Sequence, residues 1–231
     1  MVLSSVRQLL VSLQLADSAF PSGFYTMSHS LEGFSQAKLV NRLDLQDVLT
    51  DLLVHSVGPG DATALALAHR AAERGNWALV QDVDQRLFAS KLNAEMRKAS
   101  VRSGHQVTQI ALDAIGGEQL ERYSQMVTAR TTPGCQAIAS AVANAAAGVE
   151  TQHAVAADLF AFATSVVGAA LRLRLTDHRH AQVVLNAVGP VIERAAADAV
   201  ARDIDDLGGC VPLSDIMSAQ HERAEARLFA T

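Results

Sequence analysis

The spacing of the apolar residues is the feature that most constrains this chain. Leucine and valine recur at intervals of three and four, as in Leu45, Val48, Leu49, Leu52 and Leu53, which is the spacing of one helix face. No stretch of useful length alternates apolar and polar residues as a half-buried strand would. Alanine, the best helix former, occurs in frequent runs, and aromatic residues make up only 4% of the chain. We therefore predict an all-α fold, a helical bundle of roughly ten helices in a single domain over residues 1–231.

Glycine and proline divide this pattern into helices. Gly58-Pro59-Gly60 is expected to end the helix that contains Leu45, and Asp61 to cap the helix that follows. Pro133 suits the first position of a later helix, where its missing N–H is no loss. Gly104 lies inside a predicted helix, where glycine costs about 1 kcal/mol relative to alanine. We expect another helix to pack closely against Gly104.

Charge and cysteine content exclude several classes of protein. The net charge is −5 and the basic residues are scattered, so the basic stripe of a nucleic-acid binder is missing. Cys135 and Cys210 are far apart in the sequence, which is typical of free thiols in a reducing cytosol. The most apolar stretch, 159–171, is shorter than the ~20 apolar residues that span a bilayer. We expect a cytoplasmic protein that binds neither nucleic acid nor membrane.

The segment from Asp17 to Tyr25, DSAFPSGFY, separates two helical stretches. Pro21 fixes φ and Gly23 permits a positive φ, so this loop has a specified shape. Two interpretations remain open: a packed turn between helices, or a loop that presents a binding surface. The phosphate-binding pattern GxxxxGK[ST] is missing from the chain, so we expect no P-loop nucleotide site.

The segment Asp177-His178-Arg179-His180 suggests a metal site, with two imidazoles and a carboxylate. On a helix, residues two apart point to different faces, so His178 and His180 would converge on an ion only in a loop. The alternative is that these side chains are solvated in a loop, since no third or fourth ligand is evident.

Two further segments carry charge near apolar residues. Glu95 is expected to pair with Lys98 or Arg102 along a solvated helix face, where such a pair contributes about 0.3–0.5 kcal/mol. The tail ends in Arg227, Leu228 and Phe229, which either fray or anchor the tail to this chain or to a partner. Neither segment supplies a nucleophile with a base and an orienting group, so we expect no catalytic site.

Several ordered motifs resemble one family. Leu13–Phe24, LQLADSAFPSGF, followed by Ser28–Glu32, SHSLE, resembles the opening signature of UreF proteins, the urease accessory proteins. Residues 84–104 resemble the central helix of that family, and 170–173 with Gln182 resemble its AxRL…Q segment. The ending 212–229 resembles the C-terminal HExxxxRLF motif. One departure is the segment 176–181, TDHRHA, where many members carry a Gly-Gln pair.

This resemblance implies a function without chemistry of its own. UreF proteins are all-α homodimers that bind UreD, also called UreH, and with it recruit the nickel-carrying GTPase UreG, so that nickel enters apo-urease. The resemblance implies a non-enzymatic scaffold without a cofactor, with residues 212–231 as a partner-docking tail. The candidate partner-binding residues are Pro21, Gly23, Phe24, Tyr25, Glu32, Gln182, Arg227, Leu228 and Phe229. The alternative is a small helical nickel metallochaperone with Asp177, His178 and His180 as ligands.

Overall fold

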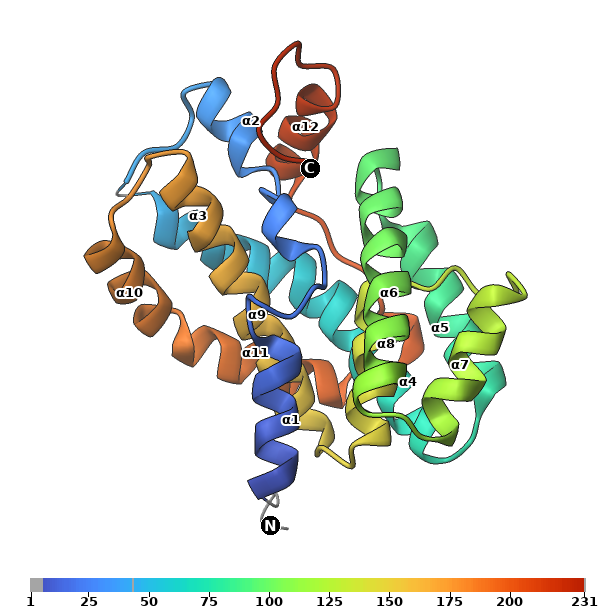
Figure 1. The fold of residues 1–231 in the computed structure, drawn as a ribbon. Coiled ribbons are helices and arrows are strands. Elements are labelled where there is room, and N and C mark those ends of the chain that lie inside the picture. The colour runs from blue at the N-terminus through green and yellow to red at the C-terminus, as the bar shows by residue number, and fades with distance from the viewer. Residues whose placement is uncertain (1–5, 43, 231) are drawn as a thin grey trace.

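The fold is helical throughout the part of the chain that the structure describes. The structure is a computed structural model that describes residues 6–42 and 44–230, and it confirms the predicted single all-α domain, with no strand in those ranges (Figure 1). The α-helices are α1 (Val6–Ala16), α2 (Leu31–Gln36), α3 (Leu45–Leu52), α4 (Thr63–Glu73), α5 (Trp77–Ser90), α6 (Ala94–Ala114), α7 (Glu118–Thr128), α8 (Gln136–Ala146), α9 (Thr151–Arg172), α10 (His178–Ala187), α11 (Gly189–Ala201) and α12 (Pro212–His221). A π-helix, η2 (Leu53–Ala62), joins α3 to α4, and η1 (Phe24–Thr26) and η3 (Ile204–Asp206) are single 3-10 turns.

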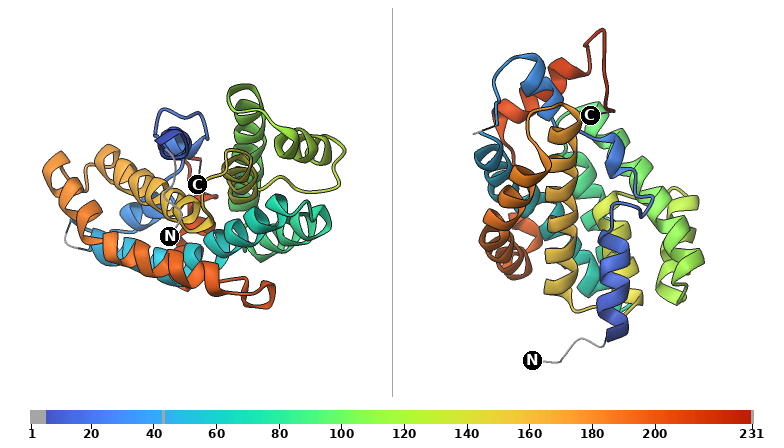
Figure 2. Two further views of the ribbon diagram at one scale, coloured as in Figure 1. Left: turned by 90° about the horizontal axis from the view of Figure 1, so that it is seen from below. Right: turned by 60° about the vertical axis from the view of Figure 1, so that its left-hand side comes forward.

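Helix α9 is the centre of the bundle. It packs against α1, α4, α8, α10 and α11, and α1 runs alongside it (Figure 2). Small buried side chains such as Ala154, Ala163 and Ala170 allow these neighbours to approach closely. Its 22 residues make it long and apolar enough to cross a membrane. The expectation that this apolar stretch is too short to span a bilayer was therefore wrong. However, 56% of its most apolar window is buried inside the protein, as expected of a core helix.

Close packing at Gly104 confirms the prediction for that position. A Cβ atom there would lie 2.0 Å from the carbonyl oxygen of Gly134 and 2.8 Å from the backbone nitrogen of Gln136. Helix α6 therefore touches the backbone of the turn that leads into α8. Only glycine allows this approach.

The helix that contains Leu45 does not end at Gly58-Pro59-Gly60, which corrects the predicted break. The backbone continues through η2 into α4, so Asp61 lies within a helix and caps none. In an α-helix the proline ring collides with the carbonyl four residues before it, and the wider π-turn relieves this. The carbonyl oxygen of Pro59 accepts a hydrogen bond from the Gly208 N–H at 3.0 Å.

The predicted start of a helix at Pro133 is also wrong, because α8 begins at Gln136. The reason is the buried carboxylate of Asp84 on α5. It accepts hydrogen bonds from the backbone N–H groups of Gly134 at 2.8 Å and Cys135 at 3.0 Å. These contacts hold the preceding turn in a non-helical conformation, with Cys135 extended at the helix N-cap.

Candidate functional site

The opening loop has the specified shape that its sequence predicts. Gly23 has φ of +84°, and a Cβ atom there would lie 2.9 Å from the Ser103 hydroxyl oxygen. Phe20 is buried in the core beneath the loop. The chain then turns through η1, and the Tyr25 side chain is 69% exposed. The loop is thus both a packed turn and a segment that presents an aromatic ring.

The buried carboxylate of Glu32 on α2 binds the C-terminal tail. It accepts hydrogen bonds from the backbone N–H groups of Leu228 at 2.9 Å and Phe229 at 3.0 Å. The Nε2 atom of His221, at the end of α12, lies 2.7 Å from its Oε2 atom. The tail therefore docks on this chain, which was one of the alternatives left open for it.

Glu95 on α6 forms a second attachment to the tail. Its Oε1 atom accepts a hydrogen bond from the Arg227 guanidinium at 2.7 Å, and its Oε2 atom lies 3.7 Å from Nδ1 of His221. The expected pairing of Glu95 with Lys98 or Arg102 was therefore wrong. A partly buried position beside the Arg227 guanidinium of the tail favours this long-range pairing over an exposed pair along the helix.

Arg172, at the end of α9, joins the tail to the opening loop. Its guanidinium stacks on the ring of Tyr25 at 4.1 Å and on the ring of Phe229 at 4.3 Å. It also donates a hydrogen bond to the carbonyl oxygen of Tyr25. The Ala230 N–H donates to the carbonyl oxygen of Thr26 at 2.8 Å. We call this assembly of the opening loop, the tail and these buried contacts the loop–tail junction.

The junction gathers most of the residues that the sequence singled out. Tyr25, Glu32, Arg227 and Phe229 are linked by the contacts above. Leu228 is 64% exposed beside them, whereas Glu32 and Phe229 are buried. Gln182 is elsewhere, exposed on α10, on the opposite side of α9 from α6 (Figure 1). A role of these residues in partner binding stays a prediction.

The segment Asp177–His180 is the start of α10, not a loop. Asp177 caps the helix by accepting a hydrogen bond from the His180 N–H at 2.9 Å, and it pairs with Arg42 at 2.7 Å. The backbone hydrogen bond from His180 is the main cause that lowers the pKa of Asp177. Nδ1 of His180 lies 2.8 Å from the Thr176 hydroxyl. Within the described ranges no group of three His, Cys, Asp or Glu side chains is arranged to hold a metal ion.

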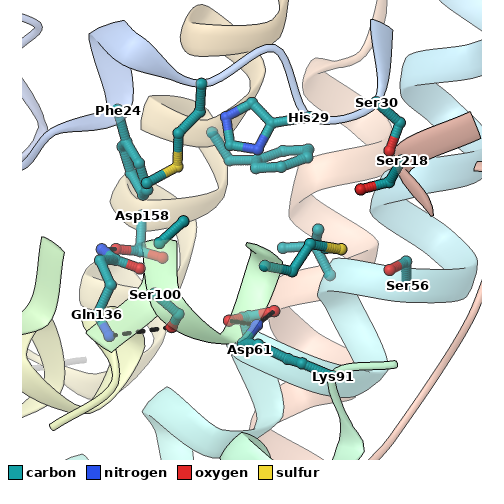
Figure 3. Close-up of a pocket in the computed structure, with 15 residues that line it drawn as sticks. Phe24, His29, Ser30, Ser56, Asp61, Lys91, Ser100, Gln136, Asp158 and Ser218 are labelled. Carbon is teal, nitrogen blue, oxygen red and sulfur yellow. Dashed lines mark hydrogen bonds and ion pairs between the residues drawn. The ribbon is translucent and has the colours of Figure 1, made fainter. Parts of the chain in front are cut away.

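A cavity of about 90 Å³, with a mostly apolar lining and a few polar groups, lies beneath the opening loop, and sequence reasoning missed it. His29 lies on one side of it, and the ion pair of Asp61 with Lys91, 2.7 Å apart, lies on the other (Figure 3). Asp158 accepts a hydrogen bond from the Gln136 amide at 3.0 Å. Burial raises the pKa of Asp158 to about 6 and lowers the pKa of His29 to about 4. The one signal for this cavity in the sequence was Asp158, a carboxylate inside the most apolar helix, α9.

Helix α1 exposes an apolar face that the sequence did not reveal. Val6, Leu9, Leu10 and Leu13 are between 54% and 75% exposed, and only Ser12 of this helix is buried. Such a row of exposed leucines is typical of a surface that another protein covers.

Comparison with known proteins decides the family. The family model described as UreF matches residues 39–189, which is more than half of the chain. The chain belongs to the UreF family. It is 29% identical to the "Urease accessory protein UreF" of Trichodesmium erythraeum (strain IMS101) over 231 residues, 100% of both chains. It is also 29% identical to "Urease accessory protein UreF 2" of Brucella canis over 225 residues, 97% of this chain and 93% of the relative. The protein of Bacillus sp. (strain TB-90) with the name UreF is 27% identical over 97% of this chain.

The loop–tail junction lies largely outside the segment that the UreF model matches. The matched segment covers residues 39–189 and includes Glu95 and Arg172. It leaves out Tyr25, Glu32 and the tail from His221 onward. The full-length similarity to the Trichodesmium protein extends over both flanks. Membership of this family of urease accessory proteins supports a role in urease maturation.

Proposed function

We propose that this protein is a non-enzymatic scaffold that holds the urease maturation complex together. In this proposal it binds a UreD (UreH) homologue and recruits the nickel-carrying GTPase UreG. The assembly inserts nickel into apo-urease in the cytoplasm, and the scaffold acts as a homodimer. Family membership supports the process, and the loop–tail junction is the observation that carries the scaffold role.

The junction suits a binding surface because its exposed side chains project from a backbone that buried contacts hold rigid. Tyr25 and Leu228 project into solvent, while Arg172 and Glu32 hold the backbone on which they sit. Aromatic side chains that are held rigid lose little entropy on binding, and Tyr and Arg are enriched among residues that dominate interface energies. A GTPase regulator needs this type of surface, since it acts only through contacts that differ between two states of its partner.

The exposed face of α1 supports a second protein contact. Its leucines form a continuous row along one side of the helix, near Phe20 and Pro21 of the opening loop. Burial of apolar surface contributes roughly 25 cal/mol per Å², so a partner that covers these side chains gains several times the free energy of a surface ion pair. A scaffold that holds two partners, or one partner and a second copy, needs two such surfaces.

The test is urease activation in cells that carry the host's urease operon at limiting nickel. Deletion of this gene is expected to abolish activity while urease protein persists, and the restored gene is expected to recover it. Co-purification with tagged UreD and UreG homologues then shows which surface of this protein each partner binds. Tyr25→Ala is expected to reduce recovery of a partner by more than tenfold, as for a residue that contributes ~1.4 kcal/mol or more.

Val183→Ala is the matched control, because Val183 is 61% exposed on α10, away from the junction. Unchanged urease activity in the deletion strain would refute the maturation role. Full recovery of both partners with Tyr25→Ala would remove the junction from the binding surface.

A further inference from the structure

A groove lies between the end of α1, the opening loop and α9, and we call it the α1–α9 groove. It has a volume of about 370 Å³ and a mostly apolar lining, to which Leu15 and Ala16 of α1 and Ala161 and Leu171 of α9 contribute. It follows α9 from Ala161 to Arg172, which is a length of ~16 Å at ~1.5 Å per residue. This length is sufficient for about five residues of an extended chain.

Gly168 of α9 lines this groove and leaves room in it. No heavy atom of the described residues lies within 4 Å of the position that a Cβ atom would take at Gly168. The packing of the bundle therefore does not require glycine here, in contrast to Gly104. The open space fits an apolar side chain that belongs to another molecule.

Arg172 lies at the end of the groove without a counter-ion. Its half-buried guanidinium contacts the rings of Tyr25 and Phe229 and donates to the carbonyl oxygens of Tyr25 and Gly168, none of which is charged. Two of its five N–H groups are used in this way, so three have no acceptor within the described ranges. A guanidinium that is held in place with free donors is a preformed site for a carboxylate.

The neighbouring charges also favour an acidic ligand. On a chain whose net charge is −5, the turn from α9 into α10 carries Arg174 and Arg179 in addition to Arg172. Two carboxylates nearby already have partners: Asp17 accepts from the loop backbone at 2.6 Å, and Asp177 is ion-paired at 2.7 Å. A free anion would leave the apolar part of the groove unfilled, so a protein segment with both an apolar and an acidic side chain is the better fit.

We propose that the α1–α9 groove binds a segment of a partner protein in which a large apolar residue lies within two positions of an aspartate or glutamate. The apolar side chain fills the space at Gly168, and the carboxylate pairs with Arg172. The two contacts are adjacent, because Nε of Arg172 lies 3.2 Å from the carbonyl oxygen of Gly168. That the partner is a member of the maturation complex rests on the proposed function; the chemistry of the groove does not.

The test uses the full-length protein and a library of short random peptides displayed on phage. Peptides are selected on the wild type and depleted on Gly168→Leu, whose side chain fills the groove. We expect the remaining peptides to share a large apolar residue within two positions of Asp or Glu. Circular dichroism and hydrogen-exchange protection of the Leu228 N–H show whether Gly168→Leu keeps the fold and the loop–tail junction. Gly189→Leu is the matched control and should bind like the wild type, because Gly189 begins α11, does not line the groove and also has open space at Cβ.

Fluorescence polarisation with a selected peptide then measures the contribution of its carboxylate. Replacement of the Asp or Glu by Asn or Gln should weaken binding to the wild type by about tenfold or more. On Arg172→Gln the acidic peptide and its amide form should bind equally, which compares the pair directly even if this variant weakens all binding.

A library that yields no peptide dependent on the groove, or peptides rich in Lys and Arg, would overturn the proposal. Peptides that need the carboxylate but not the apolar residue would also overturn it, since they would indicate a site for a free anion. If selected peptides bind as expected but tagged UreD and UreG homologues do not compete with them, the groove proposal stands. In that case the assignment of its partner to the maturation complex fails.

Discussion

Two glycine-to-alanine substitutions in helix interiors test the packing of the bundle. Gly104 in α6 and Gly168 in α9 both lie well inside long helices, so alanine should favour each helix by about 1 kcal/mol. Their surroundings differ. A Cβ atom at Gly104 would lie 2.0 Å from a backbone carbonyl oxygen, whereas nothing lies within 4 Å of one at Gly168. The backbone at Gly134 and Cys135 cannot yield cheaply, because Asp84 holds both N–H groups.

We expect Gly104→Ala to lower the free energy of unfolding by about 2 kcal/mol net, since overpacking against fixed backbone lies at the upper end of ~1–3 kcal/mol and the helix gain offsets about 1 kcal/mol of it. Gly168→Ala should raise it by up to ~1 kcal/mol. In a chain of this size each kcal/mol shifts the Tm by roughly 2–4 °C. Urea titration followed by circular dichroism measures both. A Gly104→Ala protein as stable as the Gly168→Ala protein would show that α6 does not touch the turn before α8.

Three further predictions follow from buried or capping carboxylates. Asp84→Asn should lower the free energy of unfolding by about 3 kcal/mol or more in urea titration. The reason is that an amide cannot accept all four hydrogen bonds that the carboxylate receives from Tyr123, Thr132, Gly134 and Cys135. The control is Asp82→Asn on the exposed side of α5, which should change the free energy of unfolding by under ~0.5 kcal/mol. Asp158 has a raised pKa, so its contribution to stability is present below about pH 3.8 and is lost as pH rises through about 6, whereas the lowered pKa of His29 costs stability as pH falls from 6.5 to about 4. The two trends oppose each other, so Asp158→Asn should make unfolding more acid-sensitive over this range, and an unchanged pH profile would contradict the assignment. Calorimetric titration with nickel should give the same weak binding for the wild type and for the His178→Ala, His180→Ala double variant, and tight stoichiometric binding lost in that variant would instead favour the metallochaperone.

Local sequence signals predicted the parts of the fold that local physics controls. Gly75 adopts φ of +68°, which glycine allows, and the Asn76 side chain accepts from the Leu79 N–H at 3.2 Å, so this Gly-Asn turn also caps α5. The helical period survives wherever one face is buried, as at Leu45 and Leu49. These features depend on residues within one or two turns of each other, which is the range that spacing can report.

The errors occur where a distant group overrides a local preference. Pro133 fails to begin a helix because Asp84, 50 residues from Gly134, captures the backbone of the turn. The predicted break at Gly58-Pro59-Gly60 fails because the backbone continues through the wider turns of η2, against which the distant residues Gly208 and Gly209 pack. Neither interaction has a sequence signature, since a proline or aspartate reads the same whether or not its distant partner is present.

The candidate site shows the same limit more strongly. The motifs that contain Glu32 and His221 were evident, but the contact between them joins residues 189 apart. Sequence reasoning named Glu32 as a partner-binding candidate and left open whether Phe229 anchors to this chain or to a partner, whereas both are buried in this chain and hold the exposed residues in place. Asp61 and Lys91 were missed because their pairing depends on how η2 meets the end of α5.

The loop–tail junction joins residues near the start of the chain to residues near its end, so it can form only late in folding. Glu32 accepts from the backbone at positions 228 and 229, and Thr26 accepts from position 230, so these bonds require almost the whole chain. Until the tail docks, Glu32 and Phe229 lack the contacts that bury them, and of its two ring contacts Arg172 has only the one with Tyr25. A partner that recognises Tyr25 together with Leu228 therefore discriminates a completely folded chain from a partly folded one, without any contact to the core.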